Sequence, residues 1–261
     1  MIAFTLKMLM VSGLVSVETP QTPPNCRPVT YEAASYTVCS FRQSDPGLRL
    51  FLLGPDGEPF GHFTFLNDHL TAKDERLVFA MNAGMYHEDR APVGLYIEDG
   101  ETLAPLQTGE GYGNFHLLPN GVFYIENGIA HVFQTSAYQA LAPDPDFATQ
   151  SGPMLVIDGD IHPAFRATST SFKRRNGVGV NEDTGEVFFV LSDGFVNFHT
   201  FASLFRDHLG AKQALYLDGT ISRLYAPDIH RNDVGVRMGP IVAVTRSVSE
   251  EIKPTNETEF R

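Results

Sequence analysis

The sequence of 261 residues has no tryptophan, only two cysteines and few charged residues, which make up 19% of the chain. Basic residues are scarcer than acidic ones: 19 Lys and Arg stand against 31 Asp and Glu, which gives a formal net charge of −12. Proteins that bind DNA or RNA neutralise phosphates with an excess of lysine and arginine. We therefore expect no nucleic acid among the partners. The absence of a fixed-period repeat argues against a solenoid or a propeller.

Long apolar runs are lacking as well. Residues 1–17 are mostly apolar, but a helix needs about 20 apolar residues to span a bilayer. No later segment approaches this length, so we expect no stable membrane span. We interpret residues 1–25 as a secretory signal segment and a Pro-rich spacer, with a frayed terminus or a mis-assigned start codon as the alternative. The first interpretation predicts a periplasmic or secreted protein.

The two cysteines, Cys26 and Cys39, come directly after this segment. In an oxidising compartment a disulfide between them would close a loop of about 14 residues, a constraint that contributes roughly 3 kcal/mol to stability. The alternative is two unrelated buried thiols. Neither cysteine has a neighbouring histidine in the sequence, so the ligand pattern of a structural zinc site is missing.

What the chain does contain is apolar sequence: 43% of its residues are hydrophobic, which is enough for a large core. Asn127-Gly128 and Asp158-Gly159 separate short apolar segments, as the turns of β-hairpins do. A helix is predicted over residues 200–209, between apolar strands at 187–191 and 214–217. This pattern predicts an α+β fold with a mixed, hairpin-rich β-sheet and a few packed helices.

The composition changes at two places along the chain. Prolines gather at residues 20–24, and residues 249–261 are polar. We therefore expect a single domain over residues 26–248, preceded by the signal segment and spacer and followed by a polar tail.

Three side chains stand where chemistry is expected. Asp218 directly follows the apolar strand at 214–217, and a carboxylate in that position is well placed to face a crevice. Asn82 has the same position after the strand at 77–81. For both residues an ordinary turn is the alternative. Arg175 belongs to the densest basic cluster, either as an inward-pointing clamp for phosphate or carboxylate or as part of a solvated loop.

Six short motifs follow one another along the chain, at residues 82–86, 92–95, 120–123, 151–156, 175–180 and 214–219. In this order they resemble the phosphodiester glycosidase family, and the resemblance covers roughly residues 77–244. The last motif departs from the family pattern Leu-Asp-Gly-Gly-Gly-Ser, because Thr220 and Ile221 replace two glycines before Ser222. The replacements add bulk and restrict the backbone, which suggests a subgroup with a different substrate or a loss of activity.

The resemblance implies an exported hydrolase that cleaves the sugar–phosphate glycosidic bond of a glycosyl 1-phosphodiester. Within this interpretation Asp218 is the expected catalytic carboxylate, and Asp193, at the end of the strand 187–191, is the candidate second one. The role of each is not assigned. The residues expected to bind the substrate are Asn82, Gly84, Ser151, Gly152, Arg175, Gly219 and Ser222. No cofactor is expected.

Two other functions remain open on the sequence. One is a non-catalytic envelope protein that binds sugar phosphates or cell-wall fragments. The other is a metal-dependent phosphodiesterase, whose divalent metal would be held by scattered His and Asp side chains rather than by a recognisable cluster.

Overall fold

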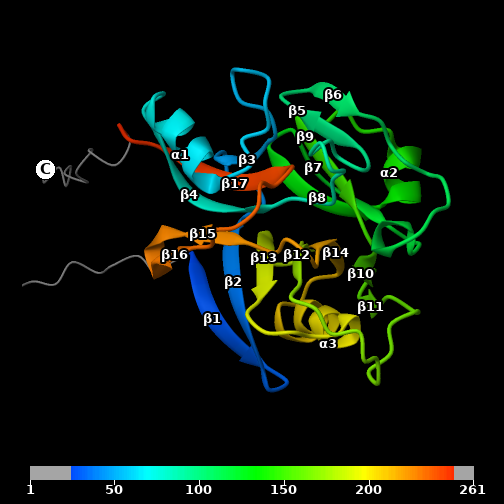
Figure 1. Cartoon of the computed structure of the whole chain (residues 1–261). Coiled ribbons are helices and arrows are strands. Elements are labelled where there is room, and N and C mark those ends of the chain that lie inside the picture. Colours follow the sequence, from blue (N-terminus) through cyan, green and yellow to red (C-terminus); the bar gives the residue numbers. More distant parts are fainter. Residues whose placement is uncertain (1–24, 250–261) are drawn as a thin grey trace, which may run out of the picture.

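The computed structural model describes residues 25–249, which contain 17 strands and three α-helices (Figure 1). Most of the predicted signal segment, spacer and tail lies outside the described residues. The strands form three sheets accompanied by separate helices, so the predicted α+β class is confirmed. Within residues 25–249, no helix has both the length and the apolar character needed to cross a membrane.

The strand orders define the three sheets. The first sheet has the order β1-β2-β13-β12-β14-β10-β11, and its strands span Cys26–Tyr31, Ala34–Arg42, Glu186–Ser192, Asn176–Asn181, Gln213–Asp218, Met154–Ile157 and Asp160–Ile161. The second has the order β16-β15-β4-β17-β3, with strands at Arg231–Asn232, Leu224–Ala226, Glu75–Asn82, Ile241–Ser247 and Leu48–Phe51. The third has the order β6-β5-β9-β7-β8, with strands at Glu101–Ala104, Tyr96–Glu98, Phe147–Ser151, Gly121–Glu126 and Ile129–Gln134.

Each sheet carries one α-helix on its outer face (Figure 1). The helices are α1 (Phe63–Thr71) on the second sheet, α2 (Thr135–Leu141) on the third and α3 (Phe198–Ser203) on the first. A π-helical turn, η2 (Leu204–His208), continues α3, and two 3₁₀ turns, η1 (Asn114–His116) and η3 (Pro227–Ile229), lie in loops. Every helix buries its apolar side against a sheet, which leaves the opposite sheet faces free to pack together.

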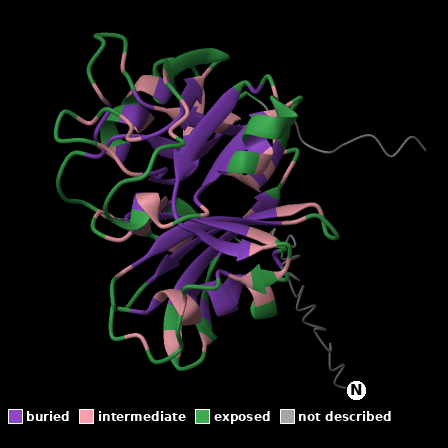
Figure 2. Ribbon diagram, turned by 90° about the vertical axis from the view of Figure 1, so that its right-hand side faces the viewer, coloured by how far each residue is buried: buried purple, intermediate pink, exposed green. Residues whose placement is uncertain are grey.

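The inner faces of the three sheets share one core (Figure 2). Four phenylalanines from the three sheets meet there: the ring centre of Phe79 lies 5.2 Å from that of Phe41 and 4.9 Å from that of Phe189. The ring of Phe123 lies 5.8 Å from that of Phe189. Buried aromatic side chains contribute much of the apolar area of a core. This shared core fixes the sheets relative to one another.

The sequence predicted a mixed sheet, whereas every pairing between the described strands is antiparallel. The prediction depended on the unit β13-α3-β14, because a helical crossover makes its two strands parallel. In the structure β12 lies between these strands and is antiparallel to both. The crossover strands therefore run in the same direction without forming a parallel pair.

The disulfide predicted between Cys26 and Cys39 is confirmed. The two residues are direct partners in the pairing of β1 with β2, and their Cα atoms are 4.0 Å apart. The bond therefore fastens the edge strand β1 to the first sheet.

Candidate functional site

The three sheets meet at a buried polar junction formed by the ends of their strands. Asn82 ends β4 of the second sheet, and Asn176 begins β12 of the first. The amide nitrogen Nδ2 of Asn176 donates to the carbonyl oxygen of Asn82 at 2.9 Å and to Oδ1 of Asn82 at 3.1 Å. In return Nδ2 of Asn82 donates to Oδ1 of Asn176 at 3.4 Å. Both side chains are fully buried, so these bonds satisfy groups that water cannot reach.

The third sheet joins the same junction through β9. The hydroxyl of Ser151 donates to the carbonyl oxygen of Leu217 at 3.0 Å, and the hydroxyl of Thr149 donates to that of Ala83 at 2.9 Å. These contacts link β9 to the end of β14 and to the residue after β4. The junction thus holds elements of all three sheets next to Asp218.

The junction also fixes the turn that follows β14. The hydroxyl of Ser222 donates to the carbonyl oxygen of Asp218 at 3.1 Å and lies 3.4 Å from Oδ1 of Asn176. The backbone N–H of Arg223 donates to Oδ1 of Asn82 at 3.0 Å. The polar groups of Asn82, Ser151 and Ser222 therefore have protein partners that support the Asp218 turn. Their predicted contacts with substrate stay a prediction.

Asp218 is a largely buried carboxylate, with 9% of its surface exposed. Its Oδ1 accepts hydrogen bonds from the backbone N–H groups of Gly219 at 2.5 Å and Thr220 at 2.8 Å. Burial raises the pKa of Asp218 above its ordinary value, and hydrogen bonds from the backbone of the turn counteract this in part. No ion-pair partner of Asp218 is found within residues 25–249. The carboxylate is therefore held in place by the backbone, without a cation beside it.

Asp218 lines a cavity of about 510 Å³. The other lining residues are Met85, Tyr86, His87, Val93, Tyr112, Gly113, Asn114, Phe115, His116, Thr220 and Ile221. Thr220 and Ile221 are the two residues that replace glycines of the family pattern, so the departure seen in the sequence reaches this cavity. We call it the Asp218 cavity.

Two histidines bring ionisable nitrogen atoms to the Asp218 cavity. Nδ1 of His116 lies 3.2 Å from the carbonyl oxygen of Gly109, and a carbonyl oxygen only accepts hydrogen bonds. The proton is therefore on Nδ1 when the ring is neutral, and Nε2 has the free lone pair. His87 comes from the loop after β4. Both side chains are available for proton transfer or for hydrogen bonding to an anion.

Gly219 and Gly84 are both required by close packing. A Cβ at Gly219 would lie 2.0 Å from the hydroxyl oxygen of Tyr216, which no side chain allows. Gly84 has a φ of +151°, and a Cβ there would lie 3.1 Å from Oγ1 of Thr149. Gly152 is confined as well, because a Cβ would lie 2.6 Å from Cβ of Asn120. These glycines let the backbone approach closely beneath the cavity.

Arg175 is fully buried beside the site, not in the wall of the Asp218 cavity. Its Nε donates to the carbonyl oxygen of Val196 at 2.9 Å, and its Nη2 to that of Ser171 at 2.8 Å. Its guanidinium carbon lies 3.6 Å from the ring centre of Phe198 and 5.5 Å from that of Tyr216. Burial lowers the pKa of Arg175. Two of its nitrogen atoms donate to carbonyl oxygens, and only Nη1 lacks a hydrogen-bond partner. The predicted clamp needs two nitrogen atoms to bind one phosphate or carboxylate, and a single nitrogen is left for this.

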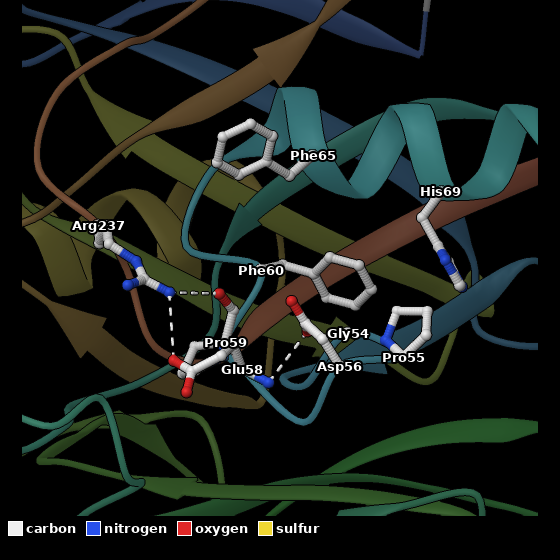
Figure 3. A pocket seen from close by; sticks show the side chains of 9 residues that line it. All are labelled: Gly54, Pro55, Asp56, Glu58, Pro59, Phe60, Phe65, His69 and Arg237. Carbon is white, nitrogen blue, oxygen red and sulfur yellow. Dashed lines mark hydrogen bonds and ion pairs between the residues drawn. The ribbon is translucent and has the colours of Figure 1, made fainter.

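A larger cavity, of about 690 Å³, lies between the loop 54–60 and helix α1 (Figure 3). None of the predicted site residues lines it. Its size alone therefore does not make it the catalytic site, because the predicted carboxylate lies in the smaller cavity.

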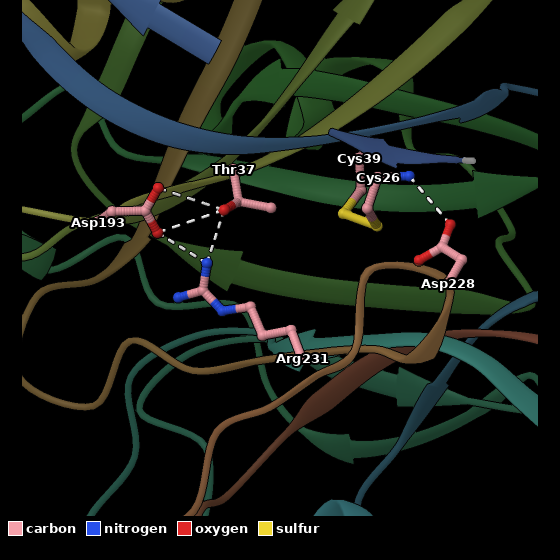
Figure 4. The surroundings of a disulfide bond; sticks show 6 residues. All are labelled: Cys26, Thr37, Cys39, Asp193, Asp228 and Arg231. Atoms are coloured by element: carbon pink, nitrogen blue, oxygen red, sulfur yellow. Dashed lines mark hydrogen bonds and ion pairs between the residues drawn. A yellow bond between two sulfur atoms is a disulfide. The ribbon is translucent and has the colours of Figure 1, made fainter. Parts of the chain in front are cut away.

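Asp193, the second predicted carboxylate, is not among the residues that line the Asp218 cavity. It lies beside Thr37 and Arg231 (Figure 4). Its Oδ1 lies 2.7 Å from Nη1 of Arg231, and the hydroxyl of Thr37 donates to the same oxygen at 3.2 Å. Arg231 also pairs with Asp233 at 3.1 Å. The structure does not bring Asp193 and Asp218 into one cavity, and it places Asp193 in an ion-pair network that ties β16 to the first sheet.

No cluster of three or more His, Cys, Asp or Glu side chains able to hold a metal ion occurs within residues 25–249. The residues of the Asp218 cavity missed by the sequence reasoning are mainly Tyr86, His87, Asn114 and His116. Tyr86 belongs to the 82–86 motif, and Asn114 and His116 follow the glycine-rich loop 109–113, which were the signals available in the sequence.

Comparison with known proteins gives two kinds of match. A sequence profile of the family described as phosphodiester glycosidase matches residues 75–250. The uncharacterized protein YigE of Escherichia coli strain K12 is 38% identical over 196 residues, which are 75% of this chain and 75% of that protein.

Among solved structures, the catalytic domain of zebrafish N-acetylglucosamine-1-phosphodiester alpha-N-acetylglucosaminidase, auto-inhibited by its pro-peptide, is similar with a TM-score of 0.57. It is 14% identical, and the match covers 84% of this chain and 81% of that one. A hypothetical protein from Synechocystis gives a TM-score of 0.54 at 15% identity, covering 84% of this chain and 61% of that one. At such identities the structures share the fold.

Proposed function

This chain belongs to the phosphodiester glycosidase family, and we propose that it hydrolyses the bond between the anomeric carbon of a sugar and the phosphate oxygen of a glycosyl 1-phosphodiester. One observation carries the proposal. Asp218 is a buried carboxylate without an ion-pair partner in the described part of the chain, and it lines a cavity of about 510 Å³. A negative charge fixed by backbone groups in such a site is suited to stabilise positive charge that develops on a substrate.

The proposed reaction breaks the bond between the anomeric carbon and the phosphate oxygen. The electron pair of this bond goes to the phosphate, which leaves as a phosphomonoester, and positive charge develops on the anomeric carbon and the ring oxygen. Asp218 stabilises this charge directly or as a nucleophile. Water then adds its oxygen to the anomeric carbon and gives a proton to a base. Phosphate leaves readily, so the chemistry needs less help from a general acid than an ordinary glycosidase does.

Other residues of the Asp218 cavity are placed to receive the phosphate. Asn114, His87 and His116 are hydrogen-bond donors or acceptors in its lining. The ring nitrogens of His87 and His116 are suited to hydrogen-bond to phosphate oxygens. Because the three side chains and Asp218 line the same cavity, we assign the sugar to the Asp218 side and the phosphate to the side of the imidazoles and the amide.

The natural substrate is proposed to differ from that of relatives with the glycine-rich turn. Thr220 and Ile221 line the Asp218 cavity, whereas glycines at these two positions would bring no side chain into it. Side chains at these positions occupy space next to the carboxylate. We therefore expect a sugar that fits the reduced space.

We also propose that the protein is exported to the periplasm or secreted. The Cys26–Cys39 disulfide supports this, because disulfides persist mainly in oxidising compartments. The measurement is the intact mass of protein from its native source under non-reducing conditions. We expect an N-terminus trimmed within residues 1–25 and a mass two hydrogens lighter than that of the dithiol. Retention of Met1 together with two free thiols would contradict export.

The test of the proposed function compares single carboxylate variants on a panel of glycosyl 1-phosphodiesters. Asp218→Asn keeps the shape but removes the charge, so turnover should fall by about 100-fold or more (about 2.7 kcal/mol) with a nearly unchanged melting temperature. The matched control is Asp183→Asn, because Asp183 is an exposed surface partner of Lys212. Near-normal turnover of Asp218→Asn, or a larger loss for Asp193→Asn, would contradict the assignment.

A further inference from the structure

The larger cavity between the loop 54–60 and α1 has an apolar lining (Figure 3). The rings of Phe60 and Phe65 and the prolines Pro55 and Pro59 line it, together with Gly54, Asp56, Glu58, His69 and Arg237. Phe65 is 59% exposed, and its ring stands at the edge of the cavity. A large aromatic ring left open to water beside a concave apolar surface is typical of a binding site. We call this the Phe65 cavity.

Arg237 and Asp56 at the Phe65 cavity are engaged with the protein backbone, whereas the carboxylate of Glu58 is 70% exposed. Nη2 of Arg237 donates to the carbonyl oxygen of Pro59 at 2.9 Å and lies 3.9 Å from the carboxylate of Glu58. Oδ1 of Asp56 accepts a hydrogen bond from the backbone N–H of Glu58 at 3.1 Å. A sugar would need free donors and acceptors here, whereas an apolar chain needs only the rings and prolines. The lining therefore favours an apolar occupant.

The Phe65 cavity and the Asp218 cavity share a wall. Tyr86 lines the Asp218 cavity, and its hydroxyl donates to the carbonyl oxygen of Arg237 at 3.2 Å. The side chain of the same arginine lines the Phe65 cavity. Gly239 packs on the Tyr86 ring so closely that a Cβ there would lie 2.7 Å from it. The segment 237–239 is thus the partition between the two cavities.

We infer that the Phe65 cavity binds the apolar alcohol of the substrate, a long alkyl or isoprenoid chain esterified to the phosphate. This inference rests on the proposed function. The carboxylates of Asp56 and Glu58 stand at the edge of the Phe65 cavity and repel a phosphate, so the phosphate stays in the Asp218 cavity. The chain leaves the phosphate, runs over the exposed side of Arg237 and lies against Phe65. The volume of the Phe65 cavity, about 690 Å³, is in the range of cavities that hold molecules of this size.

The test compares methyl and octyl phosphodiesters of one sugar as substrates. Each buried methylene strengthens binding by about two- to fourfold, so kcat/KM should be roughly tenfold or more higher for the octyl compound. Phe65→Ala should remove most of this preference and leave the methyl substrate unchanged. Phe195→Ala, which removes another exposed phenylalanine, should preserve the preference. Equal kcat/KM for the two substrates, or a loss on both in Phe65→Ala, would overturn the inference.

Binding without turnover separates this inference from the proposed function. Calorimetry on the wild type and on Phe65→Ala uses octyl glucoside, methyl glucoside and maltose as probes. We expect octyl glucoside to bind the wild type, the two other probes not to bind, and Phe65→Ala to lose the binding. Maltose that binds better than octyl glucoside would overturn the inference in favour of a sugar. If no phosphodiester is hydrolysed while octyl glucoside binds as expected, only the proposed reaction fails.

Discussion

At the scale of single residues, the turn that carries Asp218 depends on the absence of a side chain at Gly219. A Cβ at residue 219 would lie only 2.0 Å from the hydroxyl oxygen of Tyr216. Burial raises the pKa of Tyr216, so this hydroxyl stays protonated and fills the space as a neutral group. The packing of Gly219 against Tyr216 therefore fixes the position of the Asp218 carboxylate.

Gly219→Ala should lower both stability and turnover, because either the turn or the Tyr216 ring must move. Overpacking of a dense site costs about 1–3 kcal/mol of unfolding free energy. Adding Tyr216→Phe removes the obstructing oxygen, so the double variant should regain much of the loss. Urea unfolding and turnover of the two single variants and the double variant measure the coupling. Losses that simply add would show that the hydroxyl does not confine the turn.

The sequence located Asp218 because a charged residue after a buried apolar strand is a local signal. Asn82 was singled out by the same signal and Ser151 by the family resemblance, but their partners lie far away along the chain and could not be read from local pattern. Asn82 bonds to Asn176, a separation of 94 residues. His116 was missed although it follows the glycine-rich loop 109–113, because a glycine-rich loop does not show to which part of the fold the chain returns.

At the scale of elements, β5 joins the residue after β3 through the half-buried carboxylate of Glu98. Oε2 of Glu98 accepts hydrogen bonds from the backbone N–H of Leu52 at 2.9 Å and from the hydroxyl of Tyr96 at 2.9 Å. Burial raises the pKa of Glu98 to about 7, although both hydrogen bonds counteract the rise. A carboxyl group that is more easily protonated in the folded state destabilises the fold once it is ionised.

The sign of the resulting pH dependence follows from the raised pKa. Folded Glu98 holds its proton up to about pH 7, whereas the unfolded chain releases it near the ordinary value of 4.5. Its contribution to stability is therefore full at low pH and is lost as the pH rises through this window. Part of the side chain is exposed, so we expect about 1–3 kcal/mol between pH 5 and pH 8.

Glu98→Gln keeps an acceptor oxygen and removes the charge, so this part of the pH dependence should disappear. The measurement is the free energy of unfolding in urea at the two pH values. Glu101→Gln, on the exposed neighbouring strand β6, is the control and should behave as the wild type. An unchanged pH dependence in Glu98→Gln would contradict the raised pKa.

Elements with strong local patterns were predicted well. The helix predicted at 200–209 is observed as α3 and the π-helical turn after it, and Gly210, with a left-handed φ of +65°, follows its end. The strands β1, β6, β9, β15, β16 and β17 were not predicted. β1 begins at the boundary of the expected spacer, and β9 carries polar residues such as Gln150, whose amide bonds to the backbone of Gln107. Tertiary contacts, not local pattern, specify β1 and β9, whereas β17 (Ile241–Ser247) begins with an apolar, β-branched run that is itself a strand signal.

At the scale of the whole molecule, three sheets share one core, and the disulfide holds the outermost strand of the first sheet. Cys26 also donates its backbone N–H to Oδ2 of Asp228 at 3.2 Å, which links the same strand to η3 (Figure 4). Neither cysteine of the disulfide lines the Asp218 cavity. The contribution of the disulfide should therefore be to stability and not to catalysis.

Replacing both cysteines by alanine should lower the free energy of unfolding by about 2–4 kcal/mol and leave turnover at low temperature unchanged. Reducing agent should lower the melting temperature of the wild type by a similar amount and have no effect on the double variant. The unaffected double variant serves as the control for the reagent. Equal melting temperatures for oxidised wild type and double variant would contradict a stabilising disulfide.

The most direct test of the central claim is the identity of the bond that breaks. Hydrolysis of a glycosyl 1-phosphodiester in water that carries the heavy oxygen isotope places the isotope in the product that water attacked, and mass spectrometry detects it. The account predicts the isotope in the released sugar and a phosphomonoester without it, with or without a chelator. The isotope in the phosphate, together with a sugar phosphate as product, would contradict the account and show cleavage of the phosphorus–oxygen bond instead.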